Sequence, residues 1–226
     1  MTDIARGFAG HVSIGVVPTA SQLLLPIISQ AFLSEAKDVT LKAVVGQNDI
    51  LQASLKAGEL DLVIGFVIEQ LANVGDDFVT FPLFEDTVVV VARKDHGIFG
   101  VGPTVKDLVA YRWVLASTEV QSRIWLDKAF EALGLARPLA QIEANFVLML
   151  PPLIAETDFL SFISRRHLAA GGLGESLREV EVQETTMRRW FTVLYRKDSY
   201  LPPAATRLVN MLQTKARTLF SGGMGF

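Results

Sequence analysis

Short apolar runs alternate with amphipathic segments along the first third of the chain. The predicted elements are strands at 11–17, 39–45 and 60–66, a turn at 18–21 with capping residues, and helices at 22–34 and 50–57. Gly58 directly follows the second helix, at the position where a left-handed glycine ends many helices. Strand and helix in repeated succession indicate a parallel α/β sheet.

The same pattern returns after a loop at 94–103 that carries Gly97, Gly100 and Gly102. The other predicted elements are strands at 78–83, 87–93, 113–116, 142–144, 160–163, 180–182 and 190–195, and helices at 104–110, 123–133, from 146 onward, and at 202–220. Asn145 is a candidate cap for the helix that starts at Phe146. The strand at 190–195 is long enough to run back into the first sheet. Two α/β units with a cleft between them are expected, and such clefts commonly hold small ligands.

Composition excludes several classes of protein. Half of the 226 residues are apolar and a fifth are charged, which excludes a disordered chain. The longest apolar stretch, 146–155, has ten residues and two prolines, whereas a membrane-spanning helix needs about 18. We expect no membrane partner.

Charge and cysteine content narrow the partners and the compartment. A net charge of −3 gives no long-range attraction to phosphate backbones, so this segment alone is not expected to bind nucleic acid. The absence of cysteine excludes disulfides, thiol catalysis and thiolate metal sites. The start, MTDIARGFAG, lacks the apolar region of a signal peptide, which predicts a cytoplasmic location.

Motifs for catalysis, metals and cofactors are missing from the sequence. His11, His96 and His167 are far apart and show no HExxH spacing, and no GxSxG nucleophile elbow is present. The glycines of the 94–103 loop do not form the GxGxxG fingerprint of dinucleotide sites. We therefore expect no catalytic residue, no metal and no cofactor.

Small polar residues recur where predicted helices begin. They are Thr19, Ser21, Gln47, Asn48, Ser117, Thr118, Gln121, Ser122 and Asn145. Each is explicable as a helix cap, which contributes about 1 kcal/mol. Together they also match the ligand edge of open α/β sheets, where helix N–H groups attract anions. The second interpretation predicts a small anionic ligand.

Two other groups of residues have alternative interpretations. Arg165, Arg166, Arg188 and Arg189 could clamp a carboxylate or phosphate, but paired arginines beside a strand are more often a solvated surface, which we favour. Phe146 and Phe162 could wall the cleft, although a buried phenylalanine is core by default.

Three segments in order resemble the effector-binding domain of LysR-type transcriptional regulators. They are GHVSIGVVPTASQLLLPIISQAF (10–32), VTLKAVVGQNDILQASLKAGELDLVIG (39–65) and FPLFEDTVVVVARKDH (81–96). The most specific part is the group Leu55, Gly58, Leu60 and Asp61 before an apolar strand. The resemblance covers nearly the whole chain.

The resemblance implies an α/β fold with two Rossmann-like subdomains and a central cleft, of the type II periplasmic-binding-protein kind. Subdomain I would comprise 10–92 plus 197–226 and subdomain II 93–196, with 1–9 as a linker remnant. An N-terminal winged helix-turn-helix DNA-binding domain would precede Gly10 and is absent from this chain.

The implied function is sensing of a small-molecule effector, an organic anion, in the cleft. By similarity, its contacts fall at Thr19, Ala20, Ser21, Gln47, Asn48, Ser117, Thr118, Phe146 and Phe162. Where the family has a glycine-rich turn, this chain has Glu156, Thr157 and Asp158, and Pro151 and Pro152 precede them.

The resemblance also implies partners. The chain would form a homodimer, and a tetramer in the full-length protein, with DNA bound only through the missing domain. Dimers would pair 22–34 and 39–45 of one subunit with 123–133 and 142–144 of the other. Ligand binding would then change the geometry of the dimer or tetramer and hence transcription.

Two other functions share this scaffold. A solute-binding protein of an importer has the same cleft, but carries a leader and acts as a monomer. An enzyme related to deaminases or prephenate dehydratase would need an acid or base in the cleft. A helix-turn-helix encoded upstream would support the regulator, and a signal peptide the importer.

Overall fold

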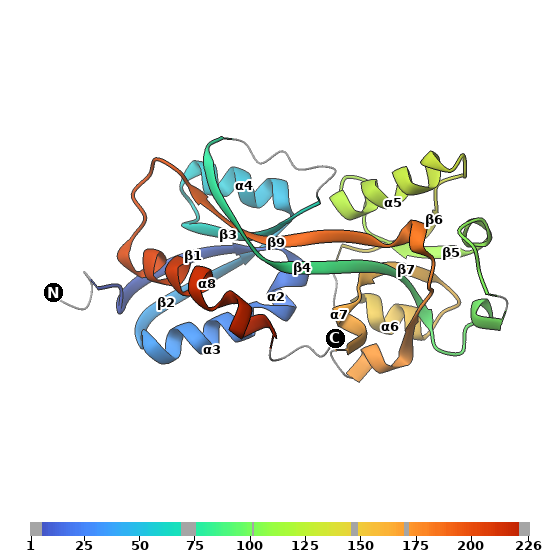
Figure 1. Ribbon diagram of the computed structural model, residues 1–226, viewed down its shortest axis with the longest axis horizontal. Helices are drawn as coiled ribbons and strands as arrows, with labels where there is room; N and C mark the ends of the chain where they lie inside the picture. The colour runs from blue at the N-terminus through green and yellow to red at the C-terminus, as the bar shows by residue number, and fades with distance from the viewer. Residues whose placement is uncertain (1–5, 69–75, 101, 146–148, 170–171, 222–226) are drawn as a thin grey trace. The chain divides into compact units, whose positions relative to one another are not determined.

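A computed structural model describes residues 6–68, 76–100, 102–145, 149–169 and 172–221. The chain forms two compact units, unit 1 (1–85 and 189–226) and unit 2 (86–188), and each is an α/β structure (Figure 1). Both divisions fall inside strands, somewhat before the subdomain boundaries that the sequence predicts at 92/93 and 196/197. Within the described residues, no helix is long and apolar enough to cross a membrane.

Unit 1 is built on parallel strands. Its elements are β1 (Ala9–Val16), α2 (Pro18–Leu23), α3 (Leu25–Glu35), β2 (Asp38–Val45), α4 (Asn48–Ala57), β3 (Leu62–Val67), the first part of β4 (Phe78–Arg93), most of β9 (Met187–Arg196) and α8 (Pro203–Ser221). The strand order is β2-β1-β3-β9. Strand β1 runs parallel to β2 and β3, and β9 runs antiparallel to β3.

Helices cover both faces of this sheet, with α4 on one face and α3 and α8 on the other (Figure 1). Val12, Ile14 and Val16 of β1 are buried, as are Leu51 and Leu55 of α4. Because the sheet is covered on both sides, β3 is a continuous apolar run that is buried on both faces rather than an alternating strand.

The turn between α4 and β3 explains the most specific part of the family resemblance. Gly58 ends α4 in the left-handed conformation, with φ at 81°, as the sequence predicts. Leu55 and Leu60 are buried on either side of it. The Asp61 carboxylate accepts a hydrogen bond from the Ser13 N–H at 2.8 Å, and the Asp61 N–H donates to the Ser13 carbonyl at 2.8 Å. Asp61 thus sets the register of β3 against β1.

Unit 2 repeats the architecture. Its elements are the rest of β4, the 3-10 helices η2 (Gly97–Gly100) and η3 (Asp107–Ala110), β5 (Arg112–Leu115), α5 (Gln121–Ala132), β6 (Leu139–Glu143), α6 (Leu150–Ala155), β7 (Leu160–Ser164), α7 (Arg166–Ala169), η5 (Gly172–Ser176), β8 (Leu177–Glu179) and η6 (Gln183–Thr185). The strand order is β4-β7-β5-β6, and β8 pairs with β4. Strand β5 runs parallel to β6 and β7, whereas β4 is antiparallel to β7.

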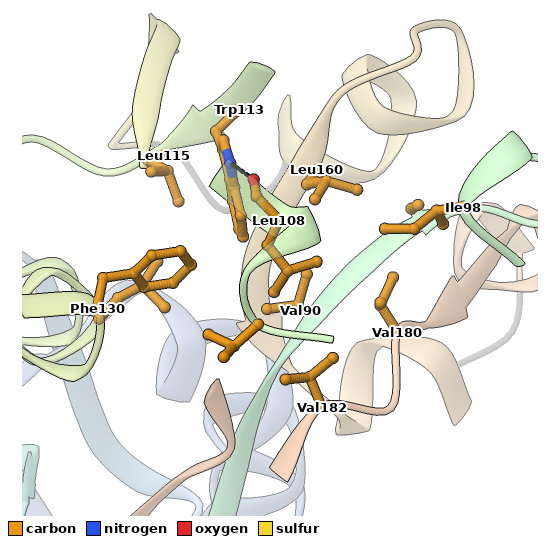
Figure 2. Close-up of a cluster of buried hydrophobic side chains, with 12 residues drawn as sticks. Val90, Ile98, Leu108, Trp113, Leu115, Phe130, Leu160, Val180 and Val182 are labelled. Carbon is orange, nitrogen blue, oxygen red and sulfur yellow. Dashed lines mark hydrogen bonds between the residues drawn. The ribbon is translucent and has the colours of Figure 1, made fainter. Parts of the chain in front are cut away.

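The valine run of β4 is buried on both faces. Val90 and Ala92 join a core with Trp113 and Phe130, shown in Figure 2, on the face covered by α5. Val89 and Val91 join a second core with α6 residues on the opposite face. The Trp113 ring meets Phe130 edge to face at 6.2 Å, and its indole N–H donates to the Leu108 carbonyl at 3.3 Å. The tryptophan therefore satisfies its polar atom within the core.

Several predicted elements differ from the structure. Residues 78–83 and 87–93 were expected as two strands but belong to the single strand β4. Two acidic residues at 85 and 86 suggest a break, yet Asp86 is buried and accepts a hydrogen bond from the Ser164 hydroxyl at 2.6 Å. The strand predicted at 180–182 is instead β8 at Leu177–Glu179, although Val180 and Val182 are buried. The pattern of polar and apolar residues in a sequence does not reveal a distant hydrogen-bond partner such as Ser164.

We expect Trp113→Ala to lower the free energy of unfolding of unit 2 by about 3–5 kcal/mol, because it leaves a large cavity in a packed core. Urea unfolding followed by circular dichroism measures this loss. Tyr200→Ala is the matched control, since Tyr200 is 78% exposed and its removal should change stability by less than about 0.5 kcal/mol. Equal losses in the two variants would contradict the assignment of Trp113 to the core.

Candidate functional site

The carboxyl ends of β1, β2 and β3 lie at one edge of unit 1 because these strands are parallel. The Val17 N–H donates to the Ile64 carbonyl at 3.1 Å, which ties the end of β1 to β3. The Gly46 N–H donates to the Val16 carbonyl at 3.3 Å, which ties the end of β2 to β1. The structure therefore brings residues 19–21 and 47–48, all predicted site residues, to the same edge.

Thr19, Ala20 and Ser21 lie inside a helix, not in a turn before one. Helix α2 begins at Pro18, because proline is well suited to the first helical position and needs no N–H partner there. Ala20 is fully buried. The Ser21 hydroxyl donates to the Pro18 carbonyl at 2.7 Å. The predicted start of this helix at Gln22 is therefore wrong, and the polar atoms lie in its first turns.

Asn48 is not the N-cap of α4, contrary to the sequence prediction. Gln47 holds that position, and Asn48 is the first helical residue. The Asn48 side-chain amide is buried and donates to the Phe66 carbonyl in β3 at 2.7 Å. A Cβ atom on Gly65 would overlap Asn48 Oδ1. Gly65 thus makes room for an amide that joins α4 to the end of β3.

In unit 2 the carboxyl ends of the parallel strands β5 and β6 are joined by two polar side chains. The Ser117 N–H donates to Asn145 Oδ1 at 2.9 Å, and the Asn145 amide N–H donates to the Ser117 hydroxyl at 2.8 Å. Asn145 therefore does not cap the next helix: α6 starts at Leu150 with Met149 as its N-cap. Ser117 is partly exposed at this edge.

The other predicted residues of unit 2 are less closely grouped. Thr118 is exposed, and its hydroxyl lies 3.3 Å from Glu119 Oε2. Phe162 is half-buried and stacks on Trp125 of α5, with ring centroids 5.9 Å apart. Phe146 lies outside the described residues. The structure places Ser117 and Thr118 in one turn, and Phe162 on the face that α5 covers.

A buried ion pair that sequence reasoning missed supports the Ser117 turn. Arg123 Nε donates to Asp127 Oδ1 at 2.8 Å, with both side chains 6% exposed. The same guanidinium donates to the Ala116 carbonyl at 3.4 Å and to the Pro138 carbonyl at 3.2 Å. It therefore joins α5 to the end of β5 and to the start of β6. The sequence could have suggested this ion pair, because Arg123 and Asp127 are four positions apart on a predicted helix and therefore share one face.

The four arginines of the sequence analysis have different environments. Arg188 is exposed, and Arg165 makes a two-point ion pair with Glu179 at 2.7 Å, whose hydrogen bonds raise the pKa of Arg165. Arg166 is largely buried, 3.7 Å from the Asp86 carboxylate. Arg189 is 4% exposed, with its guanidinium 4.5 Å from the Phe66 ring centroid. The surface interpretation is therefore wrong for Arg189, and it does not fit Arg166, whose side chain is 17% exposed.

The histidines have local partners. His11 lies 3.4 Å from the Ser13 hydroxyl, while His96 and His167 are buried against backbone groups. In the part of the chain that the structure describes, no group of three His, Asp or Glu side chains could hold a metal ion.

The model of a protein family, the LysR substrate binding domain, matches residues 5–217. The chain belongs to the LysR substrate-binding domain family. Similar proteins include the HTH-type transcriptional regulator GalR of Pseudomonas putida, 26% identical over 88% of this chain and 50% of the relative. GbpR of Azospirillum brasilense, also an HTH-type transcriptional regulator, is 23% identical over 96% of this chain and 64% of the relative. The chain thus spans about half to two thirds of these relatives.

Solved structures of LysR regulatory domains share the fold. The regulatory domain of Synechocystis CcmR, solved in complex with 2-PG, aligns over 92% of this chain and 98% of that one, with a TM-score of 0.79 and 18% identity. The effector-binding domain of QuiR, solved with shikimate, aligns over 93% and 98%, with a TM-score of 0.77 and 18% identity. The predicted type II periplasmic-binding-protein-like α/β fold of this LysR domain is confirmed.

We expect Gly65→Ala to destabilise this LysR domain by about 1–3 kcal/mol, because the added methyl group must displace the Asn48 amide from a packed site. Urea unfolding gives the change. Gly97→Ala is the matched control, because a Cβ on Gly97 meets nothing within 4 Å. Equal stability of the two variants would contradict the expected clash between a Cβ at position 65 and the Asn48 amide.

Proposed function

We propose that this chain is the effector-sensing domain of a LysR-type transcriptional regulator. The observation that carries the proposal is the family match, together with the grouping of predicted site residues at the carboxyl edge of parallel strands in each unit. Clustering of this kind is typical of ligand sites in open α/β sheets. Thr19, Ala20, Ser21, Gln47 and Asn48 are the proposed contacts in unit 1. In unit 2 they are Ser117, Thr118, Phe146 and Phe162.

The effector in this proposal is a small organic anion. The first N–H groups of α4 and α5 and the Thr19 hydroxyl are hydrogen-bond donors at these edges, and helix N-termini favour negative charge. The Ser117 hydroxyl, which donates to Asn145 Oδ1 at 3.1 Å, would exchange this bond for one to the effector. The buried Arg189 guanidinium adds a positive charge in unit 1 beside Phe66, whose carbonyl binds Asn48. CcmR and QuiR, which share the fold, are described in complex with 2-PG and shikimate.

The proposed output is transcription. The effector biases a conformational equilibrium of a dimer, or of a tetramer in the full-length protein, and a helix-turn-helix domain outside this chain binds DNA in the cytoplasm. The shift in that equilibrium is limited by the effector's difference in affinity between the two states. An importer's solute-binding protein is not favoured, because the relatives are transcriptional regulators.

Exposed apolar side chains support the proposed dimer surfaces. Leu133 follows α5 and Leu139 begins β6, and they are 48% and 66% exposed. Val45, at the end of β2, is 55% exposed. Strands β2 and β6 are the terminal strands of the sheet order. These residues lie in or beside the segments for which the family resemblance implies pairing between subunits.

The effector test begins with a thermal-shift screen of aromatic acids, sugars and amino acids. A ligand at about 100 times its Kd stabilises the folded state by about 2.7 kcal/mol. For the strongest ligand, we expect Thr19→Ala and Ser117→Ala each to weaken affinity about two- to tenfold, which corresponds to one lost hydrogen bond. Titration calorimetry measures these affinities.

Ser54→Ala is the control for this test, because the Ser54 hydroxyl donates to Glu59 on the far end of α4 and should leave affinity unchanged. Wild-type affinity in both Thr19→Ala and Ser117→Ala would refute the proposed contacts. In the double variant the two losses in binding free energy should add within about 0.5 kcal/mol if each residue contributes independently.

The dimer is tested by a charge at the proposed surface. We expect Leu139→Glu to shift the chain toward the monomer at micromolar concentration, since burying an unpaired carboxylate at an interface is costly. Sedimentation equilibrium measures the mass. Tyr200→Glu places the same charge on another exposed residue and should leave the dimer intact. A wild-type chain that is monomeric at micromolar concentration would contradict the proposed dimer.

A further inference from the structure

A cavity of about 570 Å³ lies on unit 1, beside the segment that precedes β1. It is lined by Arg6, by Glu35 at the end of α3, and by residues of α8 that include Arg207, Met211 and Lys215. Helices α3 and α8 lie on the same face of the unit 1 sheet (Figure 1). None of the predicted effector contacts lines this cavity, so it is a separate feature of the fold.

The lining is strongly cationic although the whole chain is slightly acidic. Arg6, Arg207 and Lys215 provide three positive charges and Glu35 provides one negative charge, which leaves a net charge of +2. The net charge of the chain is −3. The remaining lining residues are neutral, so this local excess of positive charge is not cancelled within the cavity.

The charged groups are held in place by contacts with one another and with Phe8. Lys215 Nζ lies 2.5 Å from Glu35 Oε1, and Arg207 Nη2 lies 3.2 Å from Glu35 Oε2. The Arg207 guanidinium also stacks on the Phe8 ring at 3.9 Å. A stacked and paired arginine loses less conformational entropy when it binds an anion than a solvated one does.

Hydrogen-bonding capacity remains in this cluster. An ammonium has three N–H donors and a guanidinium has five, far more than the two oxygens of Glu35 can accept at close range. The Arg207 side chain is 29% exposed and so remains accessible, although its Nε atom is buried without a hydrogen-bond partner among the described residues. Lys215, followed by Arg207, lowers the pKa of Glu35, so this carboxyl stays ionised at neutral pH.

Gly7, the residue after Arg6, approaches the backbone of α8 closely. Gly7 has a positive φ of 75°, and a Cβ there would collide with the carbonyl of Pro203 at the start of α8. A side chain at position 7 would therefore disturb the packing of this segment against the start of α8. The segment that enters β1 and the first turn of α8 are packed together at this point.

We propose that this cavity binds a small dianionic oxyanion, such as phosphate or a dicarboxylate, through Arg6, Arg207 and Lys215. Two negative charges match the net charge of the lining, and arginine and lysine are the usual partners of such groups. Glu35 competes with the anion for Arg207 and Lys215. It holds these two side chains in place in the free protein, and its ion pairs with them weaken when the anion binds.

The test titrates the chain with sodium phosphate at pH 7.5 by calorimetry, with ionic strength held constant by NaCl. We expect Lys215→Gln and Arg207→Gln each to weaken phosphate binding about five- to tenfold, and Glu35→Gln to strengthen it by a similar factor. Acetate, a monoanion of similar chemistry, should bind more weakly than phosphate. Circular dichroism establishes that each variant is folded.

Lys56→Gln is the matched control, because Lys56 pairs with Asp77 at 2.6 Å on the surface of the same unit and should leave phosphate binding unchanged. Weaker or unaltered binding in Glu35→Gln would overturn the proposal, as would an equal loss in Lys56→Gln. Loss of phosphate binding in Thr19→Ala or Ser117→Ala would also overturn it, because the phosphate would then occupy the strand edges. If the effector proposal failed, the phosphate site would still stand or fall by its own test, because the two share no residue.

Discussion

Parallel pairing of strands determines where the polar residues of this chain can act together. Parallel neighbours must end at one edge of the sheet, and the turns that follow them therefore lie side by side. In unit 1 this constraint joins the turns after β1 and β2 through the Gly46 to Val16 hydrogen bond. In unit 2 it joins the turns after β5 and β6 through Ser117 and Asn145. Residues about 30 positions apart in sequence thus become neighbours, although nothing in the sequence around either residue predicts the contact.

Much of the fold was predictable from the sequence because its signals are local. The β-branched runs of β1, β2 and β3 and the glycine that ends α4 depend on neighbouring residues, and they lie where the sequence predicts them. The two buried faces of the β4 valine run were also predictable, because no residue in that run is polar. Element type was thus easier to predict than the boundaries of α2 and β4.

The candidate site was less predictable because its polar side chains bind distant partners. Asparagine is a common helix cap, but the Asn48 amide binds the Phe66 carbonyl within β3 and the Asn145 amide binds the Ser117 hydroxyl after β5. Arginine is usually exposed, but Arg123 and Arg189 are both buried. Removing one partner of a buried ion pair such as Arg123 and Asp127 costs more than the pair itself contributes. Arg123 also binds the Ala116 and Pro138 carbonyls, so it ties α5 to the end of β5 and to the start of β6.

The two-segment composition of unit 1 has a consequence for synthesis on the ribosome. The Arg196 guanidinium, from the end of β9, binds the Leu55 carbonyl near the C-terminus of α4 at 2.6 Å, across 141 positions of sequence. Strand β3 also obtains its antiparallel neighbour from β9. Unit 1 therefore cannot close until almost the whole chain has emerged, whereas unit 2 is one continuous segment. The unit that is encoded second is the first that can finish folding.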